Sequence, residues 1–591
     1  MKYIVIDLET SAPSGDPSAV VKENTIVSVQ WKTPTSEVKI SRWRDVSQTS
    51  FLEDFCDSEV VVGHHLKFDM SFLHRFGYDI PGFIGSRSIW DTQAHRKLMI
   101  GNLRDKQHLE AACASMGLSI KKDKDLAYLI ANCDVATLPW SWIESRAKLD
   151  IVMTEELFKR QYARSSETIR QQVYTKSLFS VILGLVSFEG LRIDRDKALA
   201  RYNALSARCE EISRELSSIY GEEFNPGSSK QKISLLVDKL GLKVTPGYGT
   251  STPKGALSVG DDSLQILKKK TKNKTIHKAI ELLLEYSTLN AKLSKFFKPV
   301  LSHKEDRIYA EFSNFITATH RVSSTKIHTK EFPSVQFQNI PREERDCIVA
   351  DDGYVLFEID MSQAEFLAAG LLSNDPKILE DYYNKYDVHR YTASCKYHIP
   401  MEEVTKEQRT NSKSLTFTPL YDGQGESDDD KAYVASFREK YSVTRRTQLG
   451  WVDQAIATGK IEFPWGVTFY FPNEKLKWDG RAMHSTQIFN YPGQNFATAE
   501  CSSIATILLF KYLRETQYGK LINVVHDNLI VKLRPDPKIY EEVVNKCKEI
   551  FQKDIAFWLK SRYNCDIPAV FRCEWKIGRY WGDGSILSGE F

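Results

Sequence analysis

Four carboxylates in the first quarter of the chain have the types and spacing of metal ligands. Asp7 and Glu9 lie two residues apart in the apolar segment IVIDLET, so on a strand both side chains point to one face. Asp69 in VVGHHLKFDMSFL and Asp150 in SRAKLDIVMTEELF, an expected helix, add two further acids. Four carboxylates suit two Mg²⁺ or Mn²⁺ ions, which activate water in phosphodiester hydrolysis. The strand pair alone is also compatible with a solvated acidic strand edge.

A second pair of acids is separated by more than a hundred residues. In VHDNLIV, residues 525–531, Asp527 interrupts an apolar run, and a buried carboxylate needs an ionic partner, a hydrogen-bond network or a metal. Asp360 follows the apolar strand VLFEI directly and is the expected partner. The alternative is that both acids are simply solvated at strand ends.

The segment RTNSKSLTFTPLYDG, between these two acids, carries cations and aromatic rings at a spacing of four. The residues concerned are Arg409, Lys413, Phe417 and Tyr421. On a helix they form a slowly drifting stripe, with cations for phosphates and rings for a base and sugar, which suits a nucleoside triphosphate. Pro419 should end or bend this helix near Phe417. The alternative is an amphipathic helix with an incidental charged edge.

The composition is that of a folded protein large enough for several domains. The 591 residues predict about four domains, and 42% hydrophobic with 27% charged residues argue against disorder. The net charge of +3 means that binding to a polyanion must use local clusters. Ten cysteines without a CxxC pair fit a reducing, cytoplasmic compartment, and we expect neither a signal peptide nor a membrane-spanning run.

The order of apolar patterns predicts a mixed α/β and α+β multidomain chain. Residues 1–165 have the strands and helices of an α/β domain. Residues 166–310 are mostly helical, and from residue 311 strands and helices alternate to the end.

Taken together, the second set of motifs resembles family A DNA polymerases of the DNA polymerase I large-fragment type. DMSQAEF resembles the family's motif A, RTNSKSLTFTPLYDG motif B and VHDN motif C. Supporting matches are ATHRVSS, QNIP, DVHRYTA and NYPGQ, with EGLRID and EFNPGSSKQ at the entry to the thumb. The resemblance implies a right-hand polymerase, with thumb at 166–310, palm at 311–370 and 481–591, and fingers at 371–480. The compact length without a 5′-nuclease domain favours the phage type.

The N-terminal motifs resemble the DEDD 3′–5′ exonucleases, which implies a ribonuclease H-like exonuclease domain at 1–165. Metal ligands are then expected at Asp7, Glu9, Asp69 and Asp150. IWDTQA and HLEAACASMGL match the family's internal helices. Three positions depart from the pattern: Arg146 and Ser145 stand where a water-orienting Tyr or His is usual, and His65 where Asn is common. These departures put the rate of hydrolysis in doubt.

For the polymerase site, the resemblance implies two Mg²⁺ ions on Asp360, Asp527 and the backbone carbonyl of Met361, with VHDN as a hairpin tip. Arg409 and Lys413 would contact phosphates, and Lys413 would protonate pyrophosphate. The other implied nucleotide contacts are His389, Gln363, the steric gate Glu365, Phe417 and Tyr421. The implied DNA contacts are Arg321, Asn490, Gln494, His526 and Gln338. Departures from the family are Asn528 for Glu, His320 for Gly and Met361 for Tyr.

The implied activity is template-directed DNA synthesis with 3′–5′ proofreading, in phage genome replication. It would use two Mg²⁺ ions per site, which Mn²⁺ can replace. Expected partners are primer–template DNA, dNTPs, and a replication helicase, primase or processivity factor; we expect a monomer in the host cytoplasm. Two alternatives stay open: a DNA-gripping nuclease, and a docking protein with a degenerate polymerase site.

Overall fold

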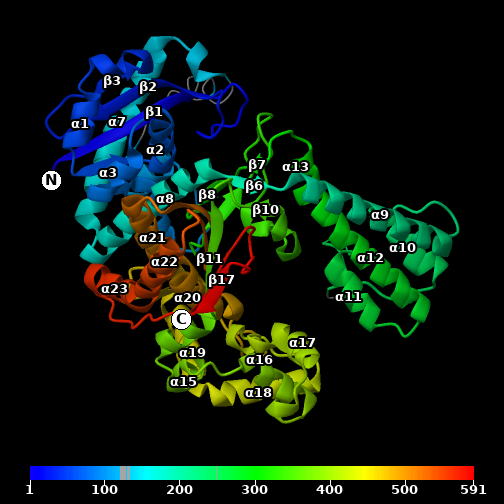
Figure 1. The fold of residues 1–591 in the computed structure, drawn as a ribbon. Helices are drawn as coiled ribbons and strands as arrows, with labels where there is room; N and C mark the ends of the chain where they lie inside the picture. Colours follow the sequence, from blue (N-terminus) through cyan, green and yellow to red (C-terminus); the bar gives the residue numbers. More distant parts are fainter. Residues whose placement is uncertain (120–127, 129–132, 248, 254) are drawn as a thin grey trace. The chain divides into compact units, whose positions relative to one another are not determined.

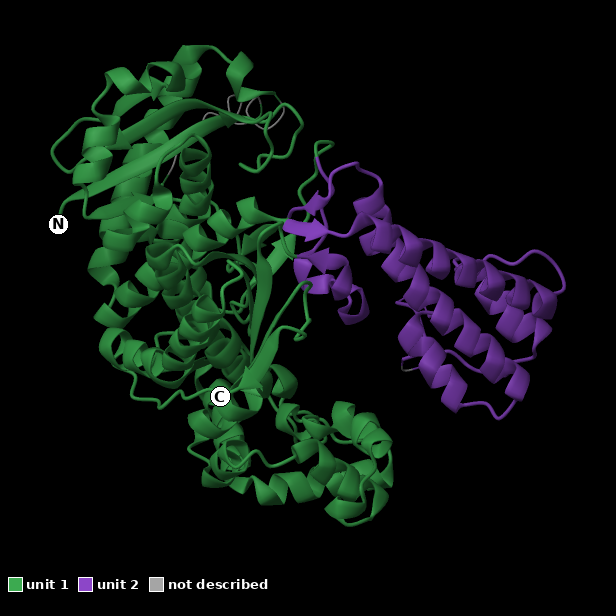
Figure 2. Cartoon of the chain, in the orientation of Figure 1, with its two compact units in different colours: residues 1–190, 310–331, 350–591 green, residues 191–309, 332–349 purple. Residues whose placement is uncertain are grey.

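The computed structural model describes residues 1–119, 128, 133–247, 249–253 and 255–591 (Figure 1). The chain divides into two compact units (Figure 2). The first contains residues 1–190, 310–331 and 350–591, and the second contains 191–309 and 332–349. Each unit combines strands with helices, so the predicted mixed α/β multidomain fold is confirmed. The finer division into exonuclease, thumb, palm and fingers stays a prediction.

The N-terminal part of the first unit is built on a five-stranded sheet of order β3-β2-β1-β4-β5. The strands are β1 (Tyr3–Ser11), β2 (Thr25–Lys32), β3 (Lys39–Arg42), β4 (Val60–Gly63) and β5 (Ser88–Asp91). The helices with it are α1 (Phe51–Asp57), α2 (Leu66–Arg75), α3 (Ile80–Ser86), α4 (Thr92–Ile100), α5 (Leu109–Ser115) and α7 (Trp140–Arg164), with 3₁₀ turns η1 (Trp43–Gln48) and η2 (Val135–Thr137). Central β1 pairs antiparallel with β2 and parallel with β4, and both α2 and α7 pack against it.

A second five-stranded sheet of the same unit is antiparallel throughout, with the order β14-β15-β11-β16-β17. Its strands are β11 (Val355–Met361), β14 (Gly519–Val525), β15 (Asn528–Leu533), β16 (Cys573–Gly578) and β17 (Leu587–Glu590). Asp360 on β11 lies across from Asn528 on one side and Glu574 on the other. β14 and β15 form a hairpin whose tip is His526 and Asp527, as predicted, and His526 turns the chain with a left-handed φ of 59°.

Helices surround this second sheet. They are α8 (Glu167–Glu189), α20 (Ser485–Asn495), α21 (Ser502–Thr516), α22 (Pro537–Glu549) and α23 (Ile555–Tyr563), with π-helical turns η9 (Phe496–Cys501) and η10 (Ile550–Asp554). Small two-stranded sheets pair β8 (Glu311–Ser313) with β9 (Ser323–Thr325) and β12 (Lys460–Glu462) with β13 (Thr468–Tyr470). Among the described residues, one helical run, Ser485–Thr516, is long and apolar enough to cross a membrane, contrary to the expectation from sequence. Because 78% of its apolar window is buried inside the protein, the run has the burial of a core helix.

The segment between Ala364 and Thr458 is helical. It contains α14 (Ala364–Ser373), α15 (Pro376–Tyr383), α16 (Val388–Tyr397), α17 (Lys406–Thr416), α18 (Asp428–Lys440) and α19 (Ser442–Thr458), with 3₁₀ turns η7 (Met401–Glu403) and η8 (Pro419–Tyr421). A capping box of Thr405 and Gln408 starts α17, and the helix stops at Thr416 because Pro419 cannot continue it. The predicted helix end is confirmed, and Tyr421 therefore lies in η8 and not on the same helix as Arg409.

The second unit consists mainly of helices around their own apolar core. They are α9 (Arg195–Tyr220), α10 (Ser229–Ile233), α11 (Asp261–Lys269), α12 (Lys274–Lys292) and α13 (Lys298–Leu301), with π-helical turns η3 (Ser234–Lys239) and η4 (Leu293–Phe297). A three-stranded sheet of β10 (Ile348–Val349), β6 (Leu191–Ile193) and β7 (Arg307–Ile308) and the 3₁₀ turns η5 (Phe337–Asn339) and η6 (Arg342–Cys347) complete it. Leu216, Leu235, Leu264 and Leu283 are fully buried between the helices.

Candidate active sites

Asp360 and Asp527 come together at one end of strands β11, β14 and β15 of the second sheet, as predicted. We call this position the sheet edge. Asp360 is the last residue but one of β11, and Asp527 lies at the β14–β15 hairpin tip, where its carbonyl oxygen accepts a 3.2 Å hydrogen bond from the amide of Met361. The side chain of Asp360 is open to solvent, yet desolvation by the surrounding protein, with repulsion from Asp527 and Glu358, raises its pKa to about 7. Burial raises the pKa of Asp527 to about 6. Two such acids favour a proton or a cation between them.

Asn528, where the resemblance leads us to expect an acid, supplies a hydrogen-bond donor to this site. Its amide nitrogen donates a 2.7 Å hydrogen bond to Glu358, which also accepts one of 3.1 Å from the indole of Trp581. The amide of Asn528 lowers the pKa of Asp360, opposing the carboxylates around it. A glutamate at 528 would place a further negative charge beside Glu358 and Asp360, whereas the amide supplies a donor.

Helix α17 presents Arg409 and Lys413 one turn apart. The Nε of Arg409 donates a 2.7 Å hydrogen bond to Asp387, the N-cap residue of α16, which fixes this end of the side chain. Lys413 is exposed, and within the described part of the chain it forms no ion pair, so its ammonium group is available to an anion.

His389 and Phe417 lie side by side next to α17. His389 shares a 2.9 Å hydrogen bond with the hydroxyl of Thr416, and its ring meets that of Phe417 edge-on at 5.6 Å. Burial, and then the charge of Arg409, lower the pKa of His389 below its ordinary value. A neutral imidazole can accept or donate a hydrogen bond beside the two cations.

Glu365, Tyr421 and Arg321 form one network. Glu365 accepts hydrogen bonds from the hydroxyl of Tyr421 and, at 2.6 Å, from Arg321. The Nε of Arg321 reaches the hydroxyl of Thr498, which in turn donates to the carbonyl of Gln494. Segments far apart in sequence are therefore joined at the position expected for the sugar and the nascent base pair.

The remaining predicted contacts lie on several elements. Gln363 is the N-cap residue of α14 with a left-handed φ of 49°, and Asn490 lies on α20, one turn before Gln494. His526 occupies the hairpin tip, where its carbonyl accepts from Ser502. Gln338 belongs to η5 of the second unit.

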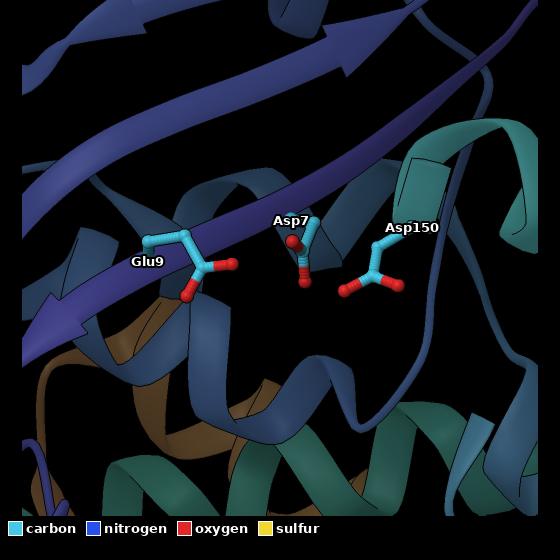
Figure 3. Close-up of side chains that lie close together, drawn as sticks. All are labelled: Asp7, Glu9 and Asp150. Carbon is cyan, nitrogen blue, oxygen red and sulfur yellow. The ribbon is translucent and has the colours of Figure 1, made fainter. Parts of the chain in front are cut away.

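Three of the four N-terminal acids form a compact cluster. Ligand atoms of Asp7, Glu9 and Asp150 all lie within 4.8 Å of one another. Figure 3 shows the first two on strand β1 and the third on helix α7, with their carboxylates on one side of the strand. Burial and the charges of Glu9 and Asp150 raise the pKa of Asp7 to about 8. The donor set is all oxygen and its charges repel, so these residues fit a hard divalent cation.

Asp69, the fourth predicted acid, lies beside this cluster on α2. Its side chain is 2% exposed and accepts a 2.9 Å hydrogen bond from the backbone amide of Leu8. Burial and the neighbouring Asp7 hold its pKa well above the ordinary value. The structure therefore brings all four predicted acids to one region.

Arg146 is a fixed cation inside this acidic cluster. Its Nε lies 3.3 Å from Glu9 and 3.4 Å from Asp150, one helical turn away on α7. The Nε of Arg146 forms no hydrogen bond with either carboxylate, so the attraction is electrostatic. The charge of Arg146 lowers the pKa of Asp7, in opposition to its acidic neighbours. Arg146, which departs from the exonuclease pattern that the sequence resembles, therefore acts as a counter-charge here.

A cavity of about 610 Å³ opens onto the cluster. Its lining includes Asp7, Arg146, Asp150, His64 and His65. Desolvation by the surrounding protein lowers the pKa of His64 to about 3 and that of His65, although His65 is exposed at the surface, to about 4, so both imidazoles are neutral at pH 7. The cavity thus combines an acidic floor with neutral rings and one arginine, which suits a nucleotide end held by divalent cations.

Several residues that shape these sites could not be found from sequence spacing. Gln30, across from Asp7 on β2, donates a 2.5 Å hydrogen bond to it, and buried Asp91 accepts from the amides of His65 and Leu66 at the start of α2. Polar residues inside apolar strands are the sequence signal for both. Their partners depend on strand pairing and on the turn before α2.

The chain is similar in sequence to known DNA polymerases. The profile described as DNA polymerase family A matches residues 196–583. DNA polymerase I of Aquifex aeolicus is 26% identical over 94% of this chain and 92% of its own length. Matches to DNA polymerase I of Pseudomonas aeruginosa (27% identical) and Thermus filiformis (26%) cover 66% and 73% of this chain, but only 43% and 50% of those proteins.

Among solved structures, the chain resembles the POL domain of Pol1 from M. smegmatis, described as a complex with DNA primer-template and dNTP. The TM-score is 0.75 over 99% of this chain and 96% of the other, at 19% identity, which establishes a shared fold. Because the profile spans most of the sequence and includes both Asp360 and Asp527, the chain belongs to DNA polymerase family A.

Proposed function

We propose that the chain extends a primer on a DNA template at the Asp360–Asp527 site and removes mispaired 3′ ends at the Asp7 cluster. The observation that carries this proposal is the meeting of Asp360 and Asp527, two acids far apart in the sequence, where the amide of Met361 and the carbonyl of Asp527 join the two segments. The family assignment supports DNA synthesis; the residue roles, the metals and the proofreading are our inference.

The chain's own residues fit a divalent metal at both sites. At the first, the charges of Asp360 and Asp527 repel when both are ionised. The carbonyl of Met361 would add an oxygen ligand. At the second, the oxygens of Asp7, Glu9 and Asp150 converge, with Asp69 behind them. Two Mg²⁺ ions per site, or Mn²⁺ in their place, would lower the pKa of the attacking oxygen and neutralise charge on the phosphate.

At the first site, different side chains contact different parts of the nucleotide. Arg409 and Lys413 bind its phosphates, with His389 beside them, and Lys413 gives a proton to the leaving pyrophosphate. Glu365, held by Arg321 and Tyr421, blocks the space that a ribose 2′-hydroxyl needs.

The remaining contacts position the sugar and the DNA. Phe417 contacts the sugar, Gln363 lies at the start of the Glu365 helix, and Tyr421 lies beside the nascent base pair. Arg321, Asn490 and Gln494 read minor-groove acceptors that all correct pairs share. His526 and Gln338 contact the primer–template. These assignments extend to the partners: primer–template DNA and dNTPs bind here, and a replication helicase, primase or processivity factor joins them in phage genome replication.

Primer extension separates this function from the two alternatives. With Mg²⁺ and dNTPs, we expect the full-length protein to extend a matched primer and to trim a 3′ mismatch before extending it. Absence of extension with retained DNA binding would favour a docking protein, and trimming without extension would favour a DNA-gripping nuclease. Each result is read from product length on a denaturing gel.

A further inference from the structure

A short loop between β13 and α20 holds a tryptophan almost completely in water. Trp478 is 98% exposed, and its neighbour Leu476 is 55% exposed. Single exposed apolar residues are common and need no explanation by themselves. What distinguishes Trp478 is a rigid and strongly charged setting.

The loop is a closed hairpin with Trp478 at its tip. The amide of Lys477 donates to the carbonyl of Arg481 at 2.7 Å, and the amide of Gly480 donates to the carbonyl of Lys477 at 3.0 Å. Gly480 has a φ of +77°, the left-handed conformation that this kind of hairpin loop requires. The backbone that carries the indole is thus held by hydrogen bonds on both sides of the tip.

Hydrogen bonds between His484 and Glu474 clamp the base of the hairpin. The side chain of Glu474 is 0% exposed and accepts hydrogen bonds from the backbone amide of His484 at 3.0 Å and from its ring Nδ1 at 2.6 Å. Because residues 474 and 484 flank the loop, this clamp fixes both of its ends. The exposed tip therefore retains its orientation without contacts of its own.

The charges around the tip are mostly positive. Lys475, Lys477 and Arg481 lie in the loop, and Asp479, which is paired with Arg481 at 2.8 Å, is the one acid between them. Three cations against one anion leave an excess of positive charge beside the indole. Such a combination of cations and an exposed ring is the recognition surface for unpaired nucleic acid.

This cationic surface continues toward the proposed polymerase site. Arg438 and Arg445 both bind one oxygen of Asp422, at 3.2 and 3.0 Å, and Asp422 directly follows Tyr421. Burial, then repulsion from Arg445 and Arg481, lower the pKa of Arg438, so the three arginines lie close enough to sense one another. Helix α20, which begins just after the loop, packs against the turn that contains Tyr421.

We propose that Trp478 stacks on an unpaired base of the single-stranded template ahead of the polymerase site, while Lys475, Lys477 and Arg481 bind the phosphates around that base. This inference rests on the proposed polymerase function. A duplex hides the faces of its bases except at its ends, so an exposed indole finds its partner in single-stranded DNA. The arginines on Asp422 would continue the path of the phosphates toward Tyr421.

The test compares two primer–templates with the same duplex, one with a single-nucleotide overhang and one with an overhang of about ten nucleotides. Binding is measured without dNTPs by fluorescence anisotropy. In the wild type, the long overhang should bind more tightly. In Trp478→Ala this advantage should fall about tenfold, the size expected for one base stacked on an aromatic ring, and Trp478→Phe should retain most of it. Leu476→Ala, in the same loop, is the matched control and should behave as wild type.

Photocrosslinking locates the contact. With 5-iododeoxyuridine placed in turn along the overhang, one position should crosslink to the peptide containing Trp478, and the crosslink should disappear in Trp478→Ala. Crosslinking only within the duplex, an equal loss on both substrates, or no loss would overturn the proposal. These outcomes differ from failure of the polymerase function, in which the wild type does not extend a primer on either substrate.

Discussion

The two acidic sites of the first unit balance the same kind of charge in opposite ways. At the sheet edge, Asp360 is open to solvent and its neighbour Asn528 is neutral. The charge of Arg321 lowers the pKa of Asp527, but Arg321 is itself paired with Glu365. In the N-terminal domain, Glu9, Asp69 and Asp150 are at most 9% exposed, and Arg146 is inserted among them. One site thus leaves its charge for ligands to neutralise, whereas the other partly neutralises its own.

This contrast has a consequence for metal binding. A carboxylate pair whose nearby arginine is already paired with another acid gains most of the attraction of an incoming Mg²⁺, whereas a cluster with an arginine between its own ligands gains less and must displace or tolerate it. We therefore expect the N-terminal cluster to bind divalent metals more weakly than its four carboxylates suggest. Variants that exchange the features of the two sites test this view.

The largest effect is expected from removing one acid at each site. Asp527→Asn should abolish synthesis and leave digestion, and Asp7→Asn should do the reverse, each with a loss of at least about a thousandfold because metal-held charge stabilisation is removed. Rapid-quench assays of extension and of mismatch trimming measure the two activities separately. Loss of both activities in either variant would mean that the two sites do not act independently.

Replacing the internal cation should sharpen the contrast. In Arg146→Leu, we expect Mn²⁺ to bind the N-terminal cluster about tenfold more tightly, because a positive charge 3.3–3.4 Å from two ligands is gone. Arg146→Tyr should also raise the rate of mismatch trimming. Isothermal titration calorimetry in an Asp360→Asn, Asp527→Asn background isolates this site.

The matched control is Arg164→Leu, an exposed arginine on the same helix. It should leave Mn²⁺ affinity unchanged. If Arg146→Leu instead bound Mn²⁺ more weakly, the arginine would be ordering the carboxylates and not competing with the metal.

The sequence was sufficient for features that depend on local pattern. The hairpin at Asp527 was implied by the resemblance of VHDN to a family motif. Alternation in IVIDLET placed Asp7 and Glu9 on one strand face, and Pro419 predicted the end of α17. Each follows from residues close together in the chain.

Contacts between distant segments could not be predicted in this way. The bond from Asn528 to Glu358 depends on β11 pairing with β15 in one register, and the network of Arg321, Glu365 and Tyr421 joins three separate segments. Sequence identified Arg146 as a departure from the family, but its role as a counter-charge appears only when α7 is packed on β1.

A smaller effect is expected from giving the sheet-edge site an additional acid. Asn528→Glu should lower the free energy of unfolding of the metal-free protein by about 1 kcal/mol, since a hydrogen bond to Glu358 is replaced by repulsion. Thermal unfolding at pH 7 measures this change. Adding Glu358→Gln should restore most of the loss, and Glu358→Gln alone is the reference. No rescue would place the repulsion on Asp360 and not on Glu358.

The dependence of stability on pH in the absence of metal tests the carboxylates of both sites together. The raised pKa values of Asp7, Asp360 and Asp527, about 8, 7 and 6, mean that the folded protein binds protons which the unfolded chain releases. Their contribution to stability is complete below the ordinary carboxyl pKa and is lost as pH rises through these values. The midpoint temperature of unfolding without metal should therefore be higher at pH 6 than at pH 8. Saturating Mg²⁺ should raise it more at pH 8 than at pH 6.

The same experiment separates the two sites, because their pKa values differ. Asp7→Asn should remove the part of the pH dependence nearest pH 8, and Asp360→Asn should remove the part nearest pH 7. Arg146→Leu should enlarge the dependence near pH 8, since the cation that now lowers the pKa of Asp7 is absent. If instead Mg²⁺ stabilised equally at both pH values in the wild type, protons and metal would not be competing for these carboxylates, and the contrast between the sites would rest on Arg146 alone.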